Sequence, residues 1–277
     1  DVRDKGQMCN NLLQYGHVYA FARAHGRKAM SMRFAYKYPW FSITGTRLHN
    51  PVRYALAKGA AALGLMPVVS YDTPGEINAE KERLILRSRN VMVQGWEVRF
   101  YEEFLTYADE IRDMFRFLPA VETAVEPLLG RSAGTLRIGL HVRRGDYARW
   151  NGGRYFFSDE QYARVAAATA ALHPGRKISL FVCTNDPALD QETYRRALPD
   201  ADIHFPKGNA AEDLCLLSHC DLIAGAPSTY SLTAAFYRDL PLYWIEDPSA
   251  PVTPESFGRF ATLFRHIKSV SYTHLRA

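Results

Sequence analysis

Two adjacent arginines, Arg143 and Arg144, follow an apolar run in segment 141–147, which reads HVRRGDY. Residues 136–142 have the pattern of a buried strand, and parallel sheets bind ligands at the carboxyl ends of their strands. Because successive side chains of extended backbone point opposite ways, one arginine can face a ligand while the other holds the loop. A guanidinium matches phosphate oxygens with a planar fork, which makes a diphosphate a suitable ligand. A surface loop closed by an ion pair with Asp146 explains the same residues.

A later segment places polar side chains where helices are expected to begin. Segment 208–236 carries Glu212 and Asp213 on one expected helix, and Ser228 and Thr229 at the start of another. Small hydroxyls and free backbone N–H groups at a helix N-terminus can form an anion site. Plain helix capping by Ser228 or Thr229 accounts for the same pattern.

The composition is that of an ordinary folded protein of 277 residues. Apolar residues make up 47% and charged residues 23% of the chain, which disfavours intrinsic disorder. Lys and Arg number 34 against 29 Asp and Glu, and they are spread along the chain, so a dedicated nucleic-acid binder is not indicated. No apolar run approaches the roughly 20 residues that a membrane-spanning helix needs, and no signal peptide is recognised.

Cysteine spacing gives no sign of a metal site. The four cysteines match neither a CxxC pair nor a zinc pattern, and we expect buried free thiols in a reducing compartment. They are Cys9, Cys183, Cys215 and Cys220. The triplet 200–202, which reads DAD, resembles a metal-binding motif, but it follows a proline and precedes an expected strand. We interpret it as a turn.

Strands and helices alternate in the second half of the chain, which predicts a parallel sheet covered by helices on both faces. The expected strands are residues 136–142, 178–183, 203–205, 221–224 and 242–245. The expected helices cover residues 160–172 and 210–218, and others begin after Ser228 and at Pro254. One more helix is expected to start with Asp186 as its N-cap and Pro187 as its first residue.

The first half has a weaker pattern. The expected helices are residues 11–23 and 101–117, and the expected strands are residues 66–71 and 90–94. The glycine-containing segment 130–134 separates the halves, which predicts domains over residues 1–130 and 131–270. Residues 1–5 hold a single apolar side chain, so we expect the first strand of the fold to be missing. Residues 271–277 fit no element, and we interpret them as a non-native or disordered tail.

Several motifs in register resemble the α-1,2-fucosyltransferases of glycosyltransferase family 11, within the wider group of α-1,2-, α-1,6- and protein O-fucosyltransferases. The family's His-x-Arg-Arg-x-Asp is present in full at residues 141–146. Segments 95–101 and 213–231 resemble two further motifs. The family's opening Gly-Gly-x-Gly-Asn-Gln-x-x-Gln-Tyr is met by Gly6, Asn10, Gln14 and Tyr15, whereas Gln7 and Cys9 replace glycines.

The resemblance implies an α/β, GT-B-like fold with two Rossmann-like domains whose parallel sheets face a cleft. It implies that residues 1–130 form the acceptor side and that residues 131–270 bind a GDP-sugar. No metal or other cofactor is expected, because an arginine can stabilise the departing diphosphate.

The resemblance also implies roles for individual residues. Arg143 would bind the β-phosphate and stabilise leaving GDP, His141 would contact the nucleotide, and Asp213 would read guanine. Ser228, Thr229 and Asn10 would complete donor binding, while Arg144 and Asp146 would hold the loop. An inverting reaction needs a base, for which the candidates are Glu97, Asp72 and Asp146; an ordinary surface or capping role is the alternative for each.

The expected activity is the inverting, metal-independent transfer of L-fucose from GDP-fucose to the 2-hydroxyl of a galactoside in a glycan. A transferase for another GDP-sugar or linkage is one alternative, and a catalytically inactive nucleotide- or glycan-binding protein is another. The expected partners are a GDP-sugar and a glycan acceptor, with no nucleic acid. We expect a bacterial-type cytoplasmic enzyme, peripheral to the inner membrane.

Overall fold

The computed structural model describes residues 1–3, 6–31, 34, 37–73 and 79–271, with the side chains of 146 and 268–271 left out. The chain forms two compact units, Asp1–Leu118 and Pro119–Ala277. The division precedes helix α7 (Pro119–Arg131), which packs on helix α10 of the second unit, whereas the sequence places a boundary at residue 130. The tail 272–277 lies outside the described residues.

The second unit contains a five-stranded parallel sheet with the strand order β6-β5-β4-β7-β8. Its strands are β4 (Leu136–Val142), β5 (Ile178–Thr184), β6 (Asp202–His204), β7 (Leu222–Gly225) and β8 (Leu242–Trp244). Each lies within two residues of its expected position. Near-continuous burial along β4 and β5 is typical of strands covered on both faces.

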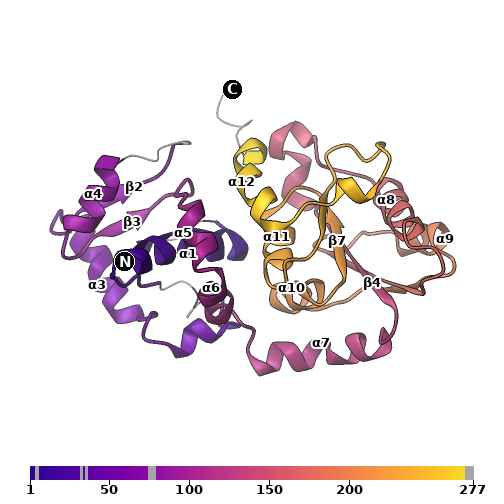
Figure 1. The fold of residues 1–277 in the computed structure, drawn as a ribbon, viewed down its shortest axis with the longest axis horizontal. Coiled ribbons are helices and arrows are strands. Elements are labelled where there is room, and N and C mark those ends of the chain that lie inside the picture. Colours follow the sequence, from indigo (N-terminus) through magenta and orange to yellow (C-terminus); the bar gives the residue numbers. More distant parts are fainter. Residues whose placement is uncertain (4–5, 32–33, 35–36, 74–78, 272–277) are drawn as a thin grey trace. The chain divides into compact units, whose positions relative to one another are not determined.

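Helices cover both faces of this sheet (Figure 1). Helices α8 (Asp159–Ala171) and α9 (Gln191–Ala197) pack together, as do α10 (Ala210–Ser218) and α11 (Thr229–Phe236). Helix α12 (Phe260–Ser271) packs on α11 and follows a short 3₁₀ turn, Pro254–Ser256. The structure therefore confirms the expected α/β class with parallel sheets.

The first unit has a smaller parallel sheet with the strand order β1-β3-β2. Its strands are β1 (Val2–Arg3), β2 (Val68–Ser70) and β3 (Met92–Gln94), so a short strand does occupy the start of the chain, where none was expected. Its described helices are α1 (Met8–Ala24), α3 (Pro51–Ala62), α4 (Ala79–Arg87), α5 (Tyr101–Thr106) and α6 (Ala108–Met114). The single helix expected over residues 101–117 is wrong, because Tyr107 breaks it with φ −104° and ψ 22°.

Helix α1 uses its polar motif residues to build the core of the first unit. The buried Gln14 amide donates to the carbonyl oxygen of Gly95 at 2.8 Å, and Tyr15 donates to that of Ala29 at 3.1 Å. Phe21 of α1 stacks on Phe100, with ring centroids 4.2 Å apart. These contacts fix α1 against the end of β3. None of the helices in the described part of the chain is long and apolar enough to cross a membrane.

Candidate functional site

The strand order of the second unit places its candidate residues at one point of the sheet. From β4 the chain moves outward through β5 and β6, then returns to β7 on the other side of β4. Ligands of such sheets bind where the order reverses, beyond the carboxyl ends of the two central strands. His141 pairs with Gly225 at this position, and a Cβ at residue 225 would lie 2.7 Å from the carbonyl oxygen of His141. Glycine is therefore required for the strands to meet there.

His141 is buried and neutral. Its ring stacks on Tyr230 of α11, with centroids 4.8 Å apart and planes 30° apart. Burial and, to a lesser degree, the positive charge of Arg143 lower the pKa of His141 to about 3. Within the described part of the chain, its Nδ1 atom has no hydrogen-bond partner. A buried imidazole nitrogen without a partner can accept from or donate to a ligand hydroxyl.

Arg143 directly follows β4 and is partly buried. Its guanidinium carbon lies 5.4 Å from the centre of the Tyr147 ring, and its backbone N–H donates to the Tyr162 hydroxyl at 3.3 Å. Tyr147 in turn donates to the carbonyl oxygen of Pro227 at 2.6 Å, just before α11. These contacts hold the loop after β4 against the loop after β7, so Arg143 lies beside the N-terminus of α11.

Asp213 lies in the first turn of α10, which begins at the same edge of the sheet. Its Oδ1 atom is buried and, among the described residues, has no hydrogen-bond partner. Burial, with a smaller contribution from Glu212, raises the pKa of Asp213 to about 7. A buried oxygen that accepts no hydrogen bond destabilises the folded protein. A ligand that donates N–H groups to Asp213 would remove this penalty.

Tyr230 connects Asp213's helix to His141. Besides stacking on His141, its hydroxyl donates to the carbonyl oxygen of Ala210, the first residue of α10, at 2.6 Å. The sequence analysis assigned no role to Tyr230 and missed this contact. Ser228 is the N-cap of α11, since its side chain accepts from the backbone N–H of Tyr230 at 3.0 Å, and Thr229 begins the helix. The structure thus gives Ser228 a capping contact.

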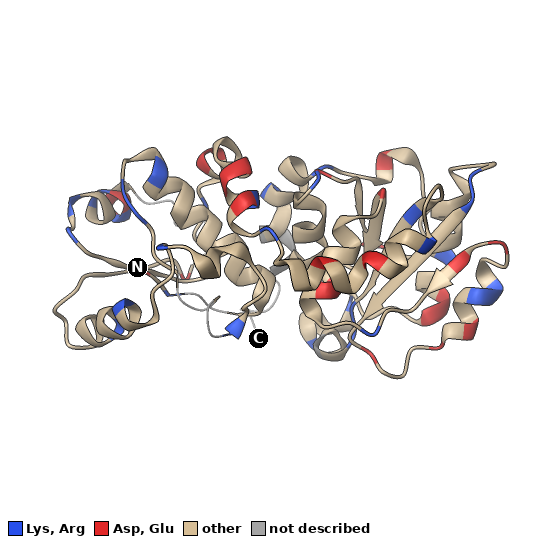
Figure 2. Ribbon diagram, turned by 90° about the horizontal axis from the view of Figure 1, so that it is seen from below, with Lys and Arg blue, Asp and Glu red and all other residues tan. Residues whose placement is uncertain are grey.

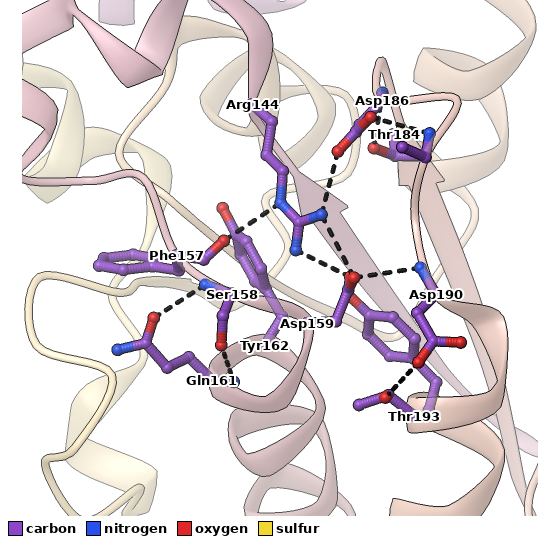
Figure 3. Close-up of polar contacts among 12 residues, drawn as sticks. Arg144, Phe157, Ser158, Asp159, Gln161, Tyr162, Thr184, Asp186, Asp190 and Thr193 are labelled. Carbon is purple, nitrogen blue, oxygen red and sulfur yellow. Dashed lines mark hydrogen bonds and ion pairs between the residues drawn. The ribbon is translucent and has the colours of Figure 1, made fainter.

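Arg144 points into an acidic cluster inside the second unit (Figure 3). Its guanidinium donates to Asp159 at 2.8 Å, to Asp186 at 3.0 Å and to the carbonyl oxygen of Phe157 at 3.1 Å. Tyr194 also donates to Asp159, at 2.8 Å. Arg144 is only 7% exposed, so this network holds the loop after β4. The side chain of Asp146 lies outside the described residues.

The structure overturns the expected cap at Asp186. Helix α9 begins later, with Asp190 as its N-cap, whose side chain accepts from the backbone N–H of Glu192. Asp186 accepts instead from Ala188 in a turn, and this bond, together with Arg144, lowers the pKa of Asp186. The two carboxylate oxygens of Asp186 have separate partners in this turn, since Oδ1 accepts from Ala188 and Oδ2 accepts from Arg144.

The remaining candidates belong to the first unit. Asn10 is partly buried on α1, and a Cβ at Gly6 would come within 2.7 Å of its Nδ2 atom. Glu97 is 8% exposed and lies 3.6 Å from the guanidinium of buried Arg99, whereas Asp72 is exposed at the end of the β2 segment. Glu97 therefore has the surroundings of a structural ion pair. Roles for these residues in donor binding or catalysis stay predictions.

The four cysteines are buried free thiols, as expected. Residues 199–200 form the turn that precedes β6, and Asp202 begins the strand, where it lies 2.9 Å from His204. Lys and Arg are scattered over the ribbons of both units rather than gathered on one element (Figure 2).

The model of the family described as "Glycosyl transferase family 11" matches residues 1–239. The chain belongs to glycosyl transferase family 11. The expected family is therefore confirmed, and the matched residues contain every site candidate discussed above. No curated protein matches the chain.

Solved fucosyltransferases share the fold of this family 11 member. POFUT1 in complex with GDP-fucose is 14% identical, with a TM-score of 0.58, 86% of this chain covered and 93% of that chain covered. NodZ from Bradyrhizobium, a fucosyltransferase, is 16% identical, with a TM-score of 0.54 and coverage of 90% and 95%. NodZ, described as an α-1,6-fucosyltransferase, was also crystallised with GDP, and that structure is 17% identical with a TM-score of 0.53 and coverage of 88% and 92%.

Proposed function

We propose that this protein transfers L-fucose from GDP-fucose to the 2-hydroxyl of a galactoside in a glycan, with inversion of configuration. The observation that carries the proposal is a pair of buried polar atoms, His141 Nδ1 and Asp213 Oδ1, at the switch point of the second unit's sheet. Neither atom has a hydrogen-bond partner among the residues that the structure describes. Family membership and the fold of known fucosyltransferases supply the reaction class.

Asp213 suits guanine because a carboxylate only accepts hydrogen bonds. The Watson–Crick edge of guanine offers two adjacent donors, the ring N1–H and the N2 amino group, whereas N1 of adenine is an acceptor. Ionised Asp213 would therefore accept from guanine and discriminate against adenine. His141 would contact the ribose through its free nitrogen, and Arg143 would face the diphosphate beside Ser228 and Thr229.

In the transfer step the acceptor oxygen bonds to C1 of fucose while the bond from C1 to the β-phosphate oxygen breaks. The acceptor proton passes to a base, and GDP leaves with the bonding electrons. Negative charge therefore grows on the diphosphate in the transition state, and a fixed guanidinium at Arg143 stabilises it more there than in the ground state. A cation of this kind supports a transfer that does not need Mg²⁺ or Mn²⁺. Glu97, Asp72 and Asp146 remain the candidates for the base.

The test is turnover of GDP-fucose with a panel of terminal galactosides, followed by assignment of the new linkage by NMR. The proposal expects an α-1,2 product and no increase in rate on addition of Mg²⁺ or Mn²⁺. Transfer from GDP-mannose instead, or another linkage, would favour the alternative of a different GDP-sugar reaction. GDP binding with no turnover on any acceptor would favour an inactive binding protein.

We also propose a peripheral membrane contact for the first unit. Val52 and Leu56, one turn apart on α3, are 71% and 70% exposed, and Leu63 and Leu65 just beyond it are 75% and 78% exposed. An apolar face of this kind inserts at a membrane interface. Sedimentation with vesicles containing anionic lipid should recover the protein, and Leu56→Gln combined with Leu63→Gln should reduce recovery; equal recovery would contradict the contact.

A further inference from the structure

Three side chains with different ligand chemistry converge where α7 packs on α10. Cys215 and His219 lie one helical turn apart at the end of α10, and Glu122 lies in the first turn of α7. The Cys215 Sγ atom is 3.5 Å from Glu122 Oε2, and the His219 Nε2 atom is 3.7 Å from the same oxygen. One ligand atom from each residue lies within 4.8 Å of the others.

The two distances to Glu122 are close to the edges of a tetrahedral zinc site. With a Zn–S bond near 2.3 Å and Zn–O and Zn–N bonds near 2.0 Å, tetrahedral angles place sulfur and oxygen about 3.5 Å apart, and nitrogen and oxygen about 3.3 Å apart. The observed distances of 3.5 and 3.7 Å need only a small adjustment. Sulfur, imidazole nitrogen and carboxylate oxygen are also the ligand types that Zn²⁺ takes in proteins.

The imidazole of His219 is already oriented for a metal. Its Nδ1 atom lies 2.9 Å from the carbonyl oxygen of Cys215, so an Nδ1–H donated to that carbonyl leaves Nε2 with a lone pair. Metal-binding histidines generally donate their second nitrogen to a carbonyl or carboxylate in this way. Nε2 is the nitrogen directed to Glu122.

We propose that Glu122, Cys215 and His219 bind one Zn²⁺ ion, with a water molecule as the fourth ligand. Cys215 is buried, whereas the side chains of His219 and Glu122 are 31% and 38% exposed, so water can reach the ion from one side. On binding, the three ligand atoms form bonds to the metal, and the thiol proton of Cys215 is released to solvent.

The proposed ion would fasten α10 to α7 and has no part in the transfer chemistry. Helix α10 carries Asp213, two residues before Cys215, so a fixed α10 would keep Asp213 in place. Sequence spacing could not indicate the site, because Glu122 precedes Cys215 by 93 residues. The inference is independent of the proposed function, since it concerns only the joint between two helices.

The test is Zn²⁺ titration of the metal-free full chain, without an affinity tag, in competition with a chromophoric chelator. We expect one tight equivalent, and with Co²⁺ in its place a thiolate-to-metal charge-transfer band. Cys215→Ser and His219→Gln should weaken Zn²⁺ binding by about 100-fold or more, since even loss of an outer-shell partner costs 10- to 100-fold. Zn²⁺ should also raise the unfolding temperature of the parent but not of these variants.

Matched control variants distinguish Zn²⁺ binding at the proposed site from Zn²⁺ binding by other carboxylates and histidines. Glu126→Gln changes an exposed carboxylate one turn further along α7, and His173→Gln changes a histidine after α8; both should bind Zn²⁺ like the parent. Zn²⁺ affinity that is equal in the parent and in His219→Gln, or a Co²⁺ complex without the thiolate band, would overturn the proposal. Unfolding of the metal-free variants at the parent temperature would show that they fold.

Discussion

The side chains of the two arginines after β4 lie in different surroundings. Arg144 is enclosed by Asp159, Asp186 and the carbonyl oxygen of Phe157, so its charge is neutralised within the protein. At the same end of the sheet as Arg143, the His141 Nδ1 and Asp213 Oδ1 atoms are buried without partners among the described residues. A folded protein satisfies the buried polar groups that hold its structure. The difference therefore separates the residues that build the loop from those positioned to receive a ligand.

The largest effect is expected for Arg144→Ala, which should lower the free energy of unfolding by about 3 to 5 kcal/mol. Removing one partner of a buried ion pair leaves Asp159 and Asp186 without compensation. Chemical denaturation with urea measures this. A loss below about 1 kcal/mol would mean that the cluster in Figure 3 does not anchor the loop.

Arg143→Ala should lower turnover by at least ~100-fold, because it removes a charge contact that strengthens in the transition state. Its free energy of unfolding should stay near that of the parent, in contrast to Arg144→Ala. Steady-state kinetics and urea denaturation of both variants provide the comparison. An unchanged turnover number for Arg143→Ala would contradict the role of Arg143 in stabilising the leaving diphosphate.

Asp213→Asn should weaken GDP binding by about 10- to 100-fold, as expected for loss of hydrogen bonds to a charged acceptor, while ADP binding changes little. The variant should also be more stable above pH 7, by roughly 1 to 4 kcal/mol, because the parent must ionise a carboxyl whose pKa is raised to about 7. The folded parent holds this proton more tightly than the unfolded chain. Stability of the parent therefore decreases between about pH 4 and pH 7, whereas the variant lacks this decrease.

GDP affinity should depend on pH through the same carboxyl. Guanine donors favour ionised Asp213, so affinity should be constant well above pH 7 and fall by up to about tenfold per pH unit below it. GDP phosphate also gains a proton in this range, and Asp213→Asn is the control that isolates the protein's contribution. Equal pH profiles for the parent and the variant would contradict guanine recognition by Asp213.

The smallest expected effect concerns Ser228, for which stability and GDP affinity together distinguish a capping role from phosphate binding. Ser228→Ala should lower the free energy of unfolding by about 1 kcal/mol through loss of the α11 cap. Ser158→Ala, which removes the equivalent cap of α8, should have the same effect on stability. Only Ser228→Ala should also weaken GDP binding, by about 2- to 10-fold. Equal GDP affinity in both variants would leave Ser228 as a cap alone.

Local sequence predicted the second unit well because four of its five strands, β4, β5, β7 and β8, are mostly buried and therefore apolar. The same approach missed α3 and α7 for identifiable reasons. Helix α3 exposes Val52 and Leu56, so its apolar residues do not follow the pattern of a core-facing helix. Helix α7 contains Pro127 in its interior, which normally ends a helix.

The site was only partly predictable from sequence. His141, Arg143 and Ser228 lie in local motifs next to strand or helix ends, which sequence can locate. The partners of Arg144 lie 15 and 42 residues away, and no spacing rule identifies Asp159 and Asp186. Stacking of Tyr230 on His141 likewise depends on the pairing of β4 with β7, which only the fold establishes.

Calorimetric titration with GDP, ADP and UDP, each with and without EDTA, tests the central claim most directly. We predict that GDP binds at least about tenfold more tightly than ADP or UDP and that EDTA leaves this preference unchanged. The variant His219→Gln should give the same result, which would separate the nucleotide site from the proposed zinc site. Equal binding of the three nucleotides would contradict guanine recognition by Asp213. GDP binding that requires added Mg²⁺ would contradict diphosphate binding by Arg143 alone.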